Sequence, residues 1–160
     1  TMSTKRILTI GEPLLRTASH PVKKFDARLS MILRDMAQTM YDAEGVGLAA
    51  PQIGLMRRIV VIDVGDGLVE LINPEIIDSQ GESAMVEGCL SVPGRRGYVI
   101  RPEKVKVRAQ DKKGHFFELE GEGLLGRALQ HEIDHLNGVL YVDLMEHEVF
   151  DEEEAEEVEA

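Results

Sequence analysis

Apolar residues recur every three or four positions in two segments of the chain, and this spacing predicts two amphipathic α-helices. The first helix is expected over about 26–44, with Asp26 as its N-cap and Gly45 closing its end. The second helix is expected over about 122–137, followed by Gly138 in the left-handed conformation that ends many helices. The apolar face of each helix should pack against the core.

Short β-branched or alternating segments lie between these helices and predict strands. They cover 58–64, 68–73, 104–109 and 115–120. Asn73-Pro74 is expected to end the second strand, and a turn at 111–114 is expected to join the last two. The strands form one block between two helices, without repeated strand–helix–strand alternation. The expected fold class is therefore α+β, with mixed or antiparallel sheets packed around a central helix in the C-terminal half.

The distribution of charge divides the chain into a body and a tail. The 160 residues carry a net charge of −11, and nine of the 29 acidic residues lie in 146–160, a segment without Lys or Arg. We expect a single domain over 1–145, close to neutral, and an acidic tail over 146–160. The stretch 151–160 should be a solvated helix end or a disordered segment. A near-neutral body argues against a broad nucleic-acid surface, which needs clustered Lys and Arg.

Several classes of protein are disfavoured by what the sequence lacks. No apolar run approaches the ~20 residues that a membrane helix needs, and no basic-then-apolar leader opens the chain, so neither a membrane protein nor a secreted one is expected. The single cysteine, Cys89, cannot form an internal disulfide, which indicates a reducing compartment. In such a compartment a thiol is inert packing, a nucleophile or a metal ligand.

The second predicted helix carries 131-HEIDH-135, which matches the pattern His-Glu-x-x-His. Residues four apart share a helix face, so both imidazoles can bind one metal ion, and Glu132 can reach water on that ion. Leu124 and Ala128 lie on the same face, which is rotated away from the core stripe and should line an internal pocket. The two histidines could instead be helix caps or hydrogen-bonded core residues.

A hydrolytic metal site needs a third protein ligand and an open position for water. One extended version of the motif has a histidine at position 141, but this chain has Tyr141. Glu146, His147 and Glu148 are available downstream, in the most solvated part of the chain. Cys89 is available upstream, at the edge of an expected strand, although a lone cysteine is often only a small buried apolar residue.

The segment 45-GVGLAAPQIG-54 is the third part of the chain that carries candidate site residues. A helix end followed by a tight loop explains Gly45 but neither Gly47 nor Gln52. Glycine lets a backbone approach a ligand closely, and a neutral amide can donate a hydrogen bond to an oxyanion. We therefore expect Gly47 and Gln52 near the site.

Three of these segments, in this order, resemble the peptide deformylase family: 45-GVGLAAPQ-52, 87-EGCLS-91 and 130-QHEIDH-135. The similarity continues through 101-RPEKVKVRAQD-111 and 136-LNGVLY-141, and it covers about 7–144. The resemblance implies a metal-dependent hydrolase that removes the N-formyl group from the initiator methionine of nascent polypeptides and releases formate.

The resemblance also implies roles for individual residues. Cys89, His131 and His135 would be the metal ligands, with Fe²⁺ in the cell and Zn²⁺, Ni²⁺ or Co²⁺ possible in the purified protein. Glu132 would be the general acid/base.

The substrate would meet a second group of residues under the same resemblance. Gln52 and the backbone N–H of Leu90 would hold the formyl oxygen. Val46, Gly47 and Gly88 would bind the substrate backbone. A small, closed pocket for that oxygen would accept a formyl group and exclude bulkier acyl groups.

The pocket for the methionine side chain is expected to be apolar. The helix phase directs Leu124 and Ala128 toward it, and Met85 could join them. Each of these three residues could instead pack in the core, and this is the role favoured for Met85. Arg127 stands where several relatives carry an aliphatic residue, and it either lines the pocket rim with its stem or pairs with an acid. Arg101 either reaches the distal substrate backbone or is a surface charge.

Two other functions are left open by the sequence: a zincin-like metallopeptidase and a non-catalytic metal-binding relative. Cys89 and the lack of a histidine at position 141 count against the first. Glu132 and Gln52, which a structural metal site does not need, count against the second. Because the expected substrates are nascent chains, transient proximity to the ribosome is expected. The acidic tail would repel RNA, so no nucleic-acid binding is expected through the tail. A bacterial cytoplasm is the expected location, because no transit peptide opens the chain.

Overall fold

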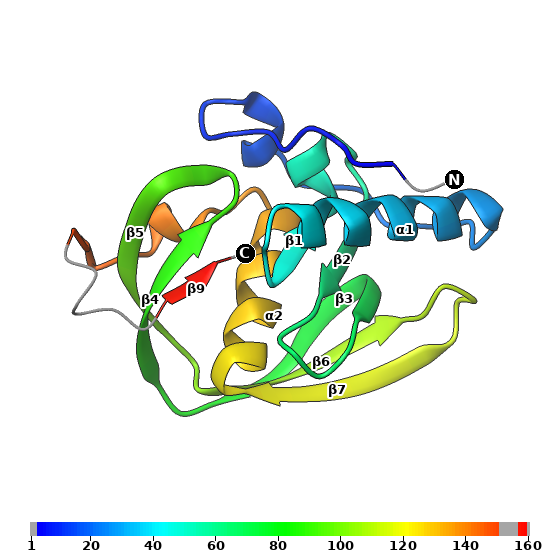
Figure 1. The fold of residues 1–160 in the computed structure, drawn as a ribbon. Coiled ribbons are helices and arrows are strands. Elements are labelled where there is room, and N and C mark those ends of the chain that lie inside the picture. Colours follow the sequence, from blue (N-terminus) through cyan, green and yellow to red (C-terminus); the bar gives the residue numbers. More distant parts are fainter. Residues whose placement is uncertain (1–2, 151–156, 160) are drawn as a thin grey trace.

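The computed structural model describes residues 3–150 and 157–159, which form two β-sheets and two α-helices (Figure 1). The α-helices are α1 (Ala27–Asp42) and α2 (Gly123–Leu136). Short 3-10 helices are η1 (Pro13–Arg16), η2 (Ala50–Ile53) and η3 (Tyr141–Asp143). No helix in this part of the chain is long and apolar enough to span a bilayer. The α+β class predicted from the sequence is confirmed.

The two sheets differ in how their strands run. The first has the order β1-β2-β3-β6-β7 and is antiparallel throughout. Its strands are β1 (Gly47–Ala49), β2 (Ile59–Ile62), β3 (Val69–Gln80), β6 (Lys104–Gln110) and β7 (Phe116–Glu122). The second sheet has the order β8-β5-β4-β9, in which only β9 runs parallel to its neighbour. Its strands are β4 (Ser83–Cys89), β5 (Val92–Arg101), β8 (His147–Glu148) and β9 (Glu157–Glu159).

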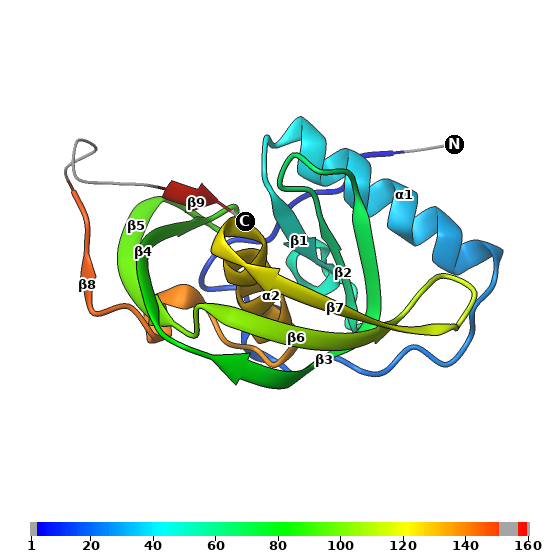
Figure 2. The same cartoon turned by 90° about the horizontal axis from the view of Figure 1, so that it is seen from below.

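Helix α2 lies between the two sheets (Figures 1 and 2). The four-residue strand β2 explains how the first sheet supports both helices, because all four of its side chains are buried. Val60 and Ile62 pack in the cluster that contains α2, whereas Ile59 and Val61 pack in the cluster that contains α1. Successive side chains of a strand point to opposite faces, so α1 and α2 cover opposite faces of this sheet.

Most of the predicted helix ends are confirmed. The carboxylate of Asp26 accepts a hydrogen bond of 3.1 Å from the backbone N–H of Leu29, as expected of an N-cap. Gly138 has a φ of +75°, the left-handed conformation predicted for the residue after α2.

The role predicted for Gly45 is wrong by one position. Helix α1 ends at Asp42, and the left-handed residue after it is Glu44, with a φ of +58°. Gly45 is needed for a tertiary reason: a Cβ there would lie 2.6 Å from the Leu90 side chain. The glycine therefore lets the end of α1 pack against the segment that follows Cys89.

The pairing of β6 with β7 is confirmed, but the expected end of the strand at Asn73-Pro74 is wrong. Strand β3 continues to Gln80 through a break in the register between Ile72 and Glu75. Asn73 takes a left-handed φ of +52°, and its side-chain amide donates to the carbonyl of Val22. A bulge can hold Pro74 inside a strand because proline then needs no ladder partner.

The C-terminal segment also departs from expectation. Strand β9 pairs in parallel with Val86, Glu87 and Gly88 of β4, so residues 157–159 are neither a helix end nor disordered. Positions 151–156 and 160, which the same expectation covered, lie outside the described residues.

Helix α2 and strand β7 lie so close together that a single added methyl group should disturb their packing. A Cβ at Gly126 would lie 2.7 Å from the backbone oxygen of Gly121, which cannot move as a flexible side chain can. Although alanine favours helices, Gly126→Ala should lower the free energy of unfolding by about 1–3 kcal/mol. Denaturant titration would measure this, with Arg34→Ala on the exposed side of α1 as the control. Unchanged or higher stability of Gly126→Ala would contradict the close packing.

Candidate metal centre

Two distant parts of the chain bring three metal-binding side chains together. Cys89 ends strand β4, and His131 and His135 lie one turn apart on α2. Their candidate ligand atoms all lie within 4.8 Å of one another, and all three residues are at least 97% buried. Cys89 Sγ and His135 Nε2 are 3.3 Å apart. The two histidines and the cysteine predicted from the sequence therefore meet at one point.

The hydrogen bonding of these groups fits a metal ion. His131 Nε2 is buried and has no hydrogen-bond partner among the described residues, and Nε2 of His135 lies beside Cys89 Sγ. Buried polar atoms are rarely left in that state, so an unpartnered imidazole nitrogen beside a thiol indicates a ligand. One sulfur and two imidazole nitrogens suit a transition metal better than Mg²⁺ or Ca²⁺, which prefer oxygen ligands.

A buried carboxylate orients one of the histidines. Glu87, which is fully buried, accepts a 2.8 Å hydrogen bond from His131 Nδ1, leaving Nε2 to face the cluster. The guanidinium groups of Arg101 and Arg127 also donate to Glu87, at 2.9 and 2.8 Å. Burial alone would raise the pKa of Glu87, but the hydrogen bonds from His131 and Arg101 outweigh it and hold the pKa well below its usual range. Glu87 is therefore an anion at neutral pH.

The positions of the two arginines correct the alternatives drawn from the sequence. Arg101 is 5% exposed, so it is not a surface charge. Its guanidinium donates to Glu87 and, at 2.8 Å, to Asp134. Arg127 is 3% exposed and pairs with Glu87, which agrees with the alternative of a nearby acid rather than a pocket rim. Contact of either arginine with substrate stays a prediction.

Glu132 lies beside the cluster as an isolated carboxyl group. It is fully buried, and neither carboxylate oxygen has a hydrogen-bond partner among the described residues. Burial raises the pKa of Glu132 to about 7, although His131 opposes the shift. A Cβ at Gly47 would lie 2.7 Å from Glu132 Oε2, so the glycine is needed for the strand to approach this carboxyl. A group that can hold or release a proton near neutral pH thus lies next to His131 on α2.

The side chain of Gln52 is fixed with its amide nitrogen toward the cluster. Its Oε1 accepts a 2.9 Å hydrogen bond from the backbone N–H of Ala49. Its Nε2 donates to Ser91 Oγ at 3.1 Å and lies 3.7 Å from Cys89 Sγ. The amide is fully buried and carries no charge. It is therefore a neutral donor next to the candidate metal ligands.

The remaining predicted site residues are spread around this centre. Val46 precedes β1, Gly47 is its first residue, and Gly88 and Leu90 flank Cys89. Met85, also on β4, and Leu124, on α2, are half-buried. Ala128 is fully buried in the cluster between α2 and the first sheet, in agreement with the core-packing alternative. Binding of substrate by these residues stays a prediction.

Two residues near the centre were given no role by the sequence analysis. Glu87 was visible within 87-EGCLS-91, but its partners come from β5 and α2, so no local spacing indicated them. Tyr141, considered only as a missing histidine, is buried with its ring stacked 6.1 Å from that of His131. Its position after the histidine helix was the only available signal.

Comparison with known proteins gives a consistent result. Residues 4–150 match the model of the polypeptide deformylase family. A peptide deformylase of Thermoanaerobacter pseudethanolicus is 55% identical over 157 residues, or 98% of each chain. The crystal structure of a peptide deformylase from Legionella pneumophila is similar with a TM-score of 0.87 and 50% identity, covering 89% of this chain and 86% of that one. The crystal structure of a peptide deformylase from Thermotoga maritima is similar with a TM-score of 0.89 and 44% identity, covering 91% of this chain and 99% of that one.

The Glu87 network predicts that one neutral substitution affects both metal binding and stability. Glu87→Gln should weaken metal affinity about 10- to 100-fold, because His131 loses the anion that orients it. The metal-free protein should lose about 3 kcal/mol of stability, because the buried guanidinium group of Arg127 loses its counter-charge and that of Arg101 keeps only Asp134. Chelator competition and denaturant titration measure the two effects.

Glu118→Gln is the matched control, because Glu118 is exposed and pairs with Lys106 at 3.3 Å. It should cost less than about 1 kcal/mol and leave metal affinity unchanged. Wild-type metal affinity in Glu87→Gln would show that the carboxylate does not orient His131.

Proposed function

The chain belongs to the polypeptide deformylase family, whose members remove the N-formyl group from nascent polypeptides, and from this premise we propose that Cys89, His131 and His135 hold its catalytic metal ion. The observation that carries the proposal is the meeting of these three buried side chains beside the carboxyl group of Glu132. The His-Glu-x-x-His sequence on α2 would then supply two ligands and the residue that handles protons.

The ion is proposed to be Fe²⁺ in the cell, with Zn²⁺, Ni²⁺ or Co²⁺ possible in the purified protein. A divalent cation held by these ligands supplies Lewis acidity and makes water a better nucleophile at neutral pH. A thiolate from Cys89 would offset part of the charge of the ion, and Glu87 would keep His131 in the tautomer that leaves Nε2 free to bind.

Glu132 is proposed as the general acid/base. Its pKa of about 7 lets it accept a proton from attacking water and return it to the leaving amine in one cycle near neutral pH. Since its two oxygens have no partner among the described residues, no other group competes for that proton. Gly47 allows β1 to pack closely against this carboxyl, which limits its movement.

Gln52 and the backbone N–H of Leu90 are proposed to stabilise the oxygen of the formyl group as it gains negative charge. The hydrogen bond from Ala49 fixes the Gln52 amide, so its donor is oriented before substrate arrives. One such donor is typically worth ~3 kcal/mol in the transition state. Because Gln52 is neutral, it adds no charge that would compete with the metal ligands.

The substrate backbone is proposed to run past Val46, Gly47 and Gly88, with the methionine side chain near Leu124, Ala128 and Met85. Pairing of β4 with β9 at Gly88 supports this path, because this edge accepts an extended main chain, and a substrate bound there would take the place of β9. Arg101 and Arg127 already bind Glu87 or Asp134, which favours a positioning role for them over substrate contact.

The proposed setting follows from the substrate and from the relatives. Nascent chains carrying formyl-methionine are the partners, and their source implies transient proximity to the ribosome. The relatives named above are bacterial, which supports a bacterial cytoplasm. We also propose that residues 1–145 form the catalytic domain, to whose second sheet the acidic segment 146–160 adds strands β8 and β9. The family match replaces the zincin-like alternative, and the experiment below addresses a non-catalytic relative.

Replacing Glu132 should separate metal binding from turnover. Glu132→Ala keeps all three proposed ligands, so its metal content should match that of the wild type. Formate release from formyl-methionyl peptides should fall by at least about 10²- to 10⁴-fold. Metal analysis and a formate assay on anaerobically purified protein measure the two quantities, with Glu118→Gln as the control. Wild-type turnover in Glu132→Ala would remove this residue from the mechanism, and an inactive wild type holding its metal would indicate a non-catalytic relative.

The proposed oxygen-binding pocket predicts selectivity for small acyl groups. Formyl-methionyl peptides should be hydrolysed faster than acetyl-methionyl peptides by at least about tenfold in kcat/KM, the size expected for one extra methyl group in a closed pocket. The two rates are compared on peptides of otherwise identical sequence. Equal turnover would show that the pocket around Gln52 does not select the acyl group.

A further inference from the structure

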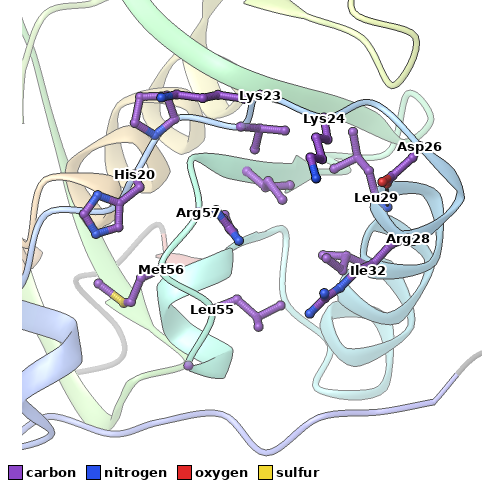
Figure 3. Close-up of a pocket in the computed structure, with 14 residues that line it drawn as sticks. His20, Lys23, Lys24, Asp26, Arg28, Leu29, Ile32, Leu55, Met56 and Arg57 are labelled. Atoms are coloured by element: carbon purple, nitrogen blue, oxygen red, sulfur yellow. Dashed lines mark hydrogen bonds between the residues drawn. The ribbon is translucent and has the colours of Figure 1, made fainter.

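A cavity of about 920 Å³ lies away from the proposed metal centre, between residues 20–28, helix α1 and residues 54–59 (Figure 3). None of the residues that line it has been assigned to metal, proton transfer or substrate. A smaller cavity of about 210 Å³ shares Arg28, Ile32 and Leu55 with it and continues along α1. We call the two cavities together the α1 groove.

The floor of the α1 groove is apolar. Leu29 and Ile59 are buried at its base, and Ile32 and Leu55 are half-buried. Further along, Met31 is 46% exposed. Backbone hydrogen bonds hold the two walls of the groove together. The N–H of His20 donates to the carbonyl of Met56, and the N–H of Arg58 donates to the carbonyl of His20, both at 3.0 Å.

The rim of the α1 groove is basic. Lys23, Lys24, Arg28 and Arg57 line the larger cavity and are exposed. None of these four forms an ion pair within the part of the chain that the structure describes. The one acid in this lining, Asp26, already caps α1. A protein of net charge −11 thus has a groove whose charge is opposite to that of the whole chain.

We propose that the α1 groove binds the acidic segment 149–156 of a second copy of this chain, because residues 157–159 already pair with β4 of their own chain. That sequence, 149-VFDEEEAE-156, combines apolar residues with five acids and no basic residue. Phe150 is 86% exposed, which makes it available to insert into an apolar floor. Acidic side chains would then face the four unpaired cations of the rim.

The lining of the groove distinguishes this occupant from a nucleic acid, which the same cations could attract. Proteins that bind single-stranded nucleic acid usually stack its bases on aromatic rings. The α1 groove is lined by aliphatic side chains and contains no Phe, Tyr or Trp. An aliphatic floor beneath a basic rim fits a peptide with an apolar anchor next to acids. The inference does not depend on the proposed catalytic residues.

Self-association of the full-length protein is the first test. Sedimentation over a range of protein concentrations should show reversible association of the wild type. The double variant Lys23→Glu with Lys24→Glu should weaken this association at least about tenfold, and Phe150→Ser should do the same from the other side of the contact. The pair Lys112→Glu with Lys113→Glu, in the exposed β6–β7 turn, makes the same charge change and should have no effect.

Direct binding is the second test. A fluorescent peptide of sequence 149–156, which leaves out the β9 residues that pair with β4, is titrated with the wild type and with both double variants, in parallel with a single-stranded RNA oligonucleotide of equal charge. The peptide should bind the wild type and the Lys112/Lys113 variant, bind the Lys23/Lys24 variant at least about tenfold more weakly, and lose affinity as salt rises. All variants should keep deformylase activity when dilute, which shows that they are folded.

A protein that stays monomeric at all concentrations and binds no peptide would overturn the proposal. Preference for the RNA over the peptide would overturn it in favour of a nucleic-acid site. Equal weakening by the Lys112/Lys113 variant would show that the effect is one of net charge and not of the α1 groove, and this would overturn it too.

Discussion

The ion-pair network around Glu87 is the interaction on which the site depends. One buried carboxylate on β4 accepts hydrogen bonds from His131 and Arg127 on α2 and from Arg101 on β5. It therefore ties the second sheet to the helix that carries two of the proposed ligands. A buried carboxylate is costly unless several donors surround it, and here the donors also fix the geometry of the site.

Two close backbone contacts bring β1 and the end of α1 up to the site. Gly47 lets β1 reach the carboxyl group of Glu132, and Gly45 lets the end of α1 reach Leu90. The hydrogen bond from Ala49 then holds Gln52 toward Cys89. The 3-10 helix η2, which follows β1, thus contributes the neutral donor and the second sheet the sulfur. Helix α2 contributes the two histidines and the proposed general acid/base.

Regular local patterns accounted for much of the fold. The apolar periodicity identified both helices, with Asp26 and Gly138 at their ends, and the alternation in 104–120 identified the β6–β7 hairpin. Failures occurred where a tertiary contact outweighed a local preference. Asn73-Pro74 looked like a strand end but is accommodated in a bulge held by Val22, and β9 exists only because β4 offers it an edge.

The sequence by itself determined the chemical types at the centre and their phase on the helix. A thiol, two imidazoles one turn apart, a carboxyl and an amide can all be seen without coordinates, because helix periodicity is a local property. Only the tertiary structure decided which charges meet. From the sequence alone Arg101 could contact the distal substrate backbone or be a surface charge, but the fold buries it against Glu87 and Asp134. The physical reason is that an ion pair depends on distance in space, and residues 14 to 44 positions apart carry no local signal of that distance.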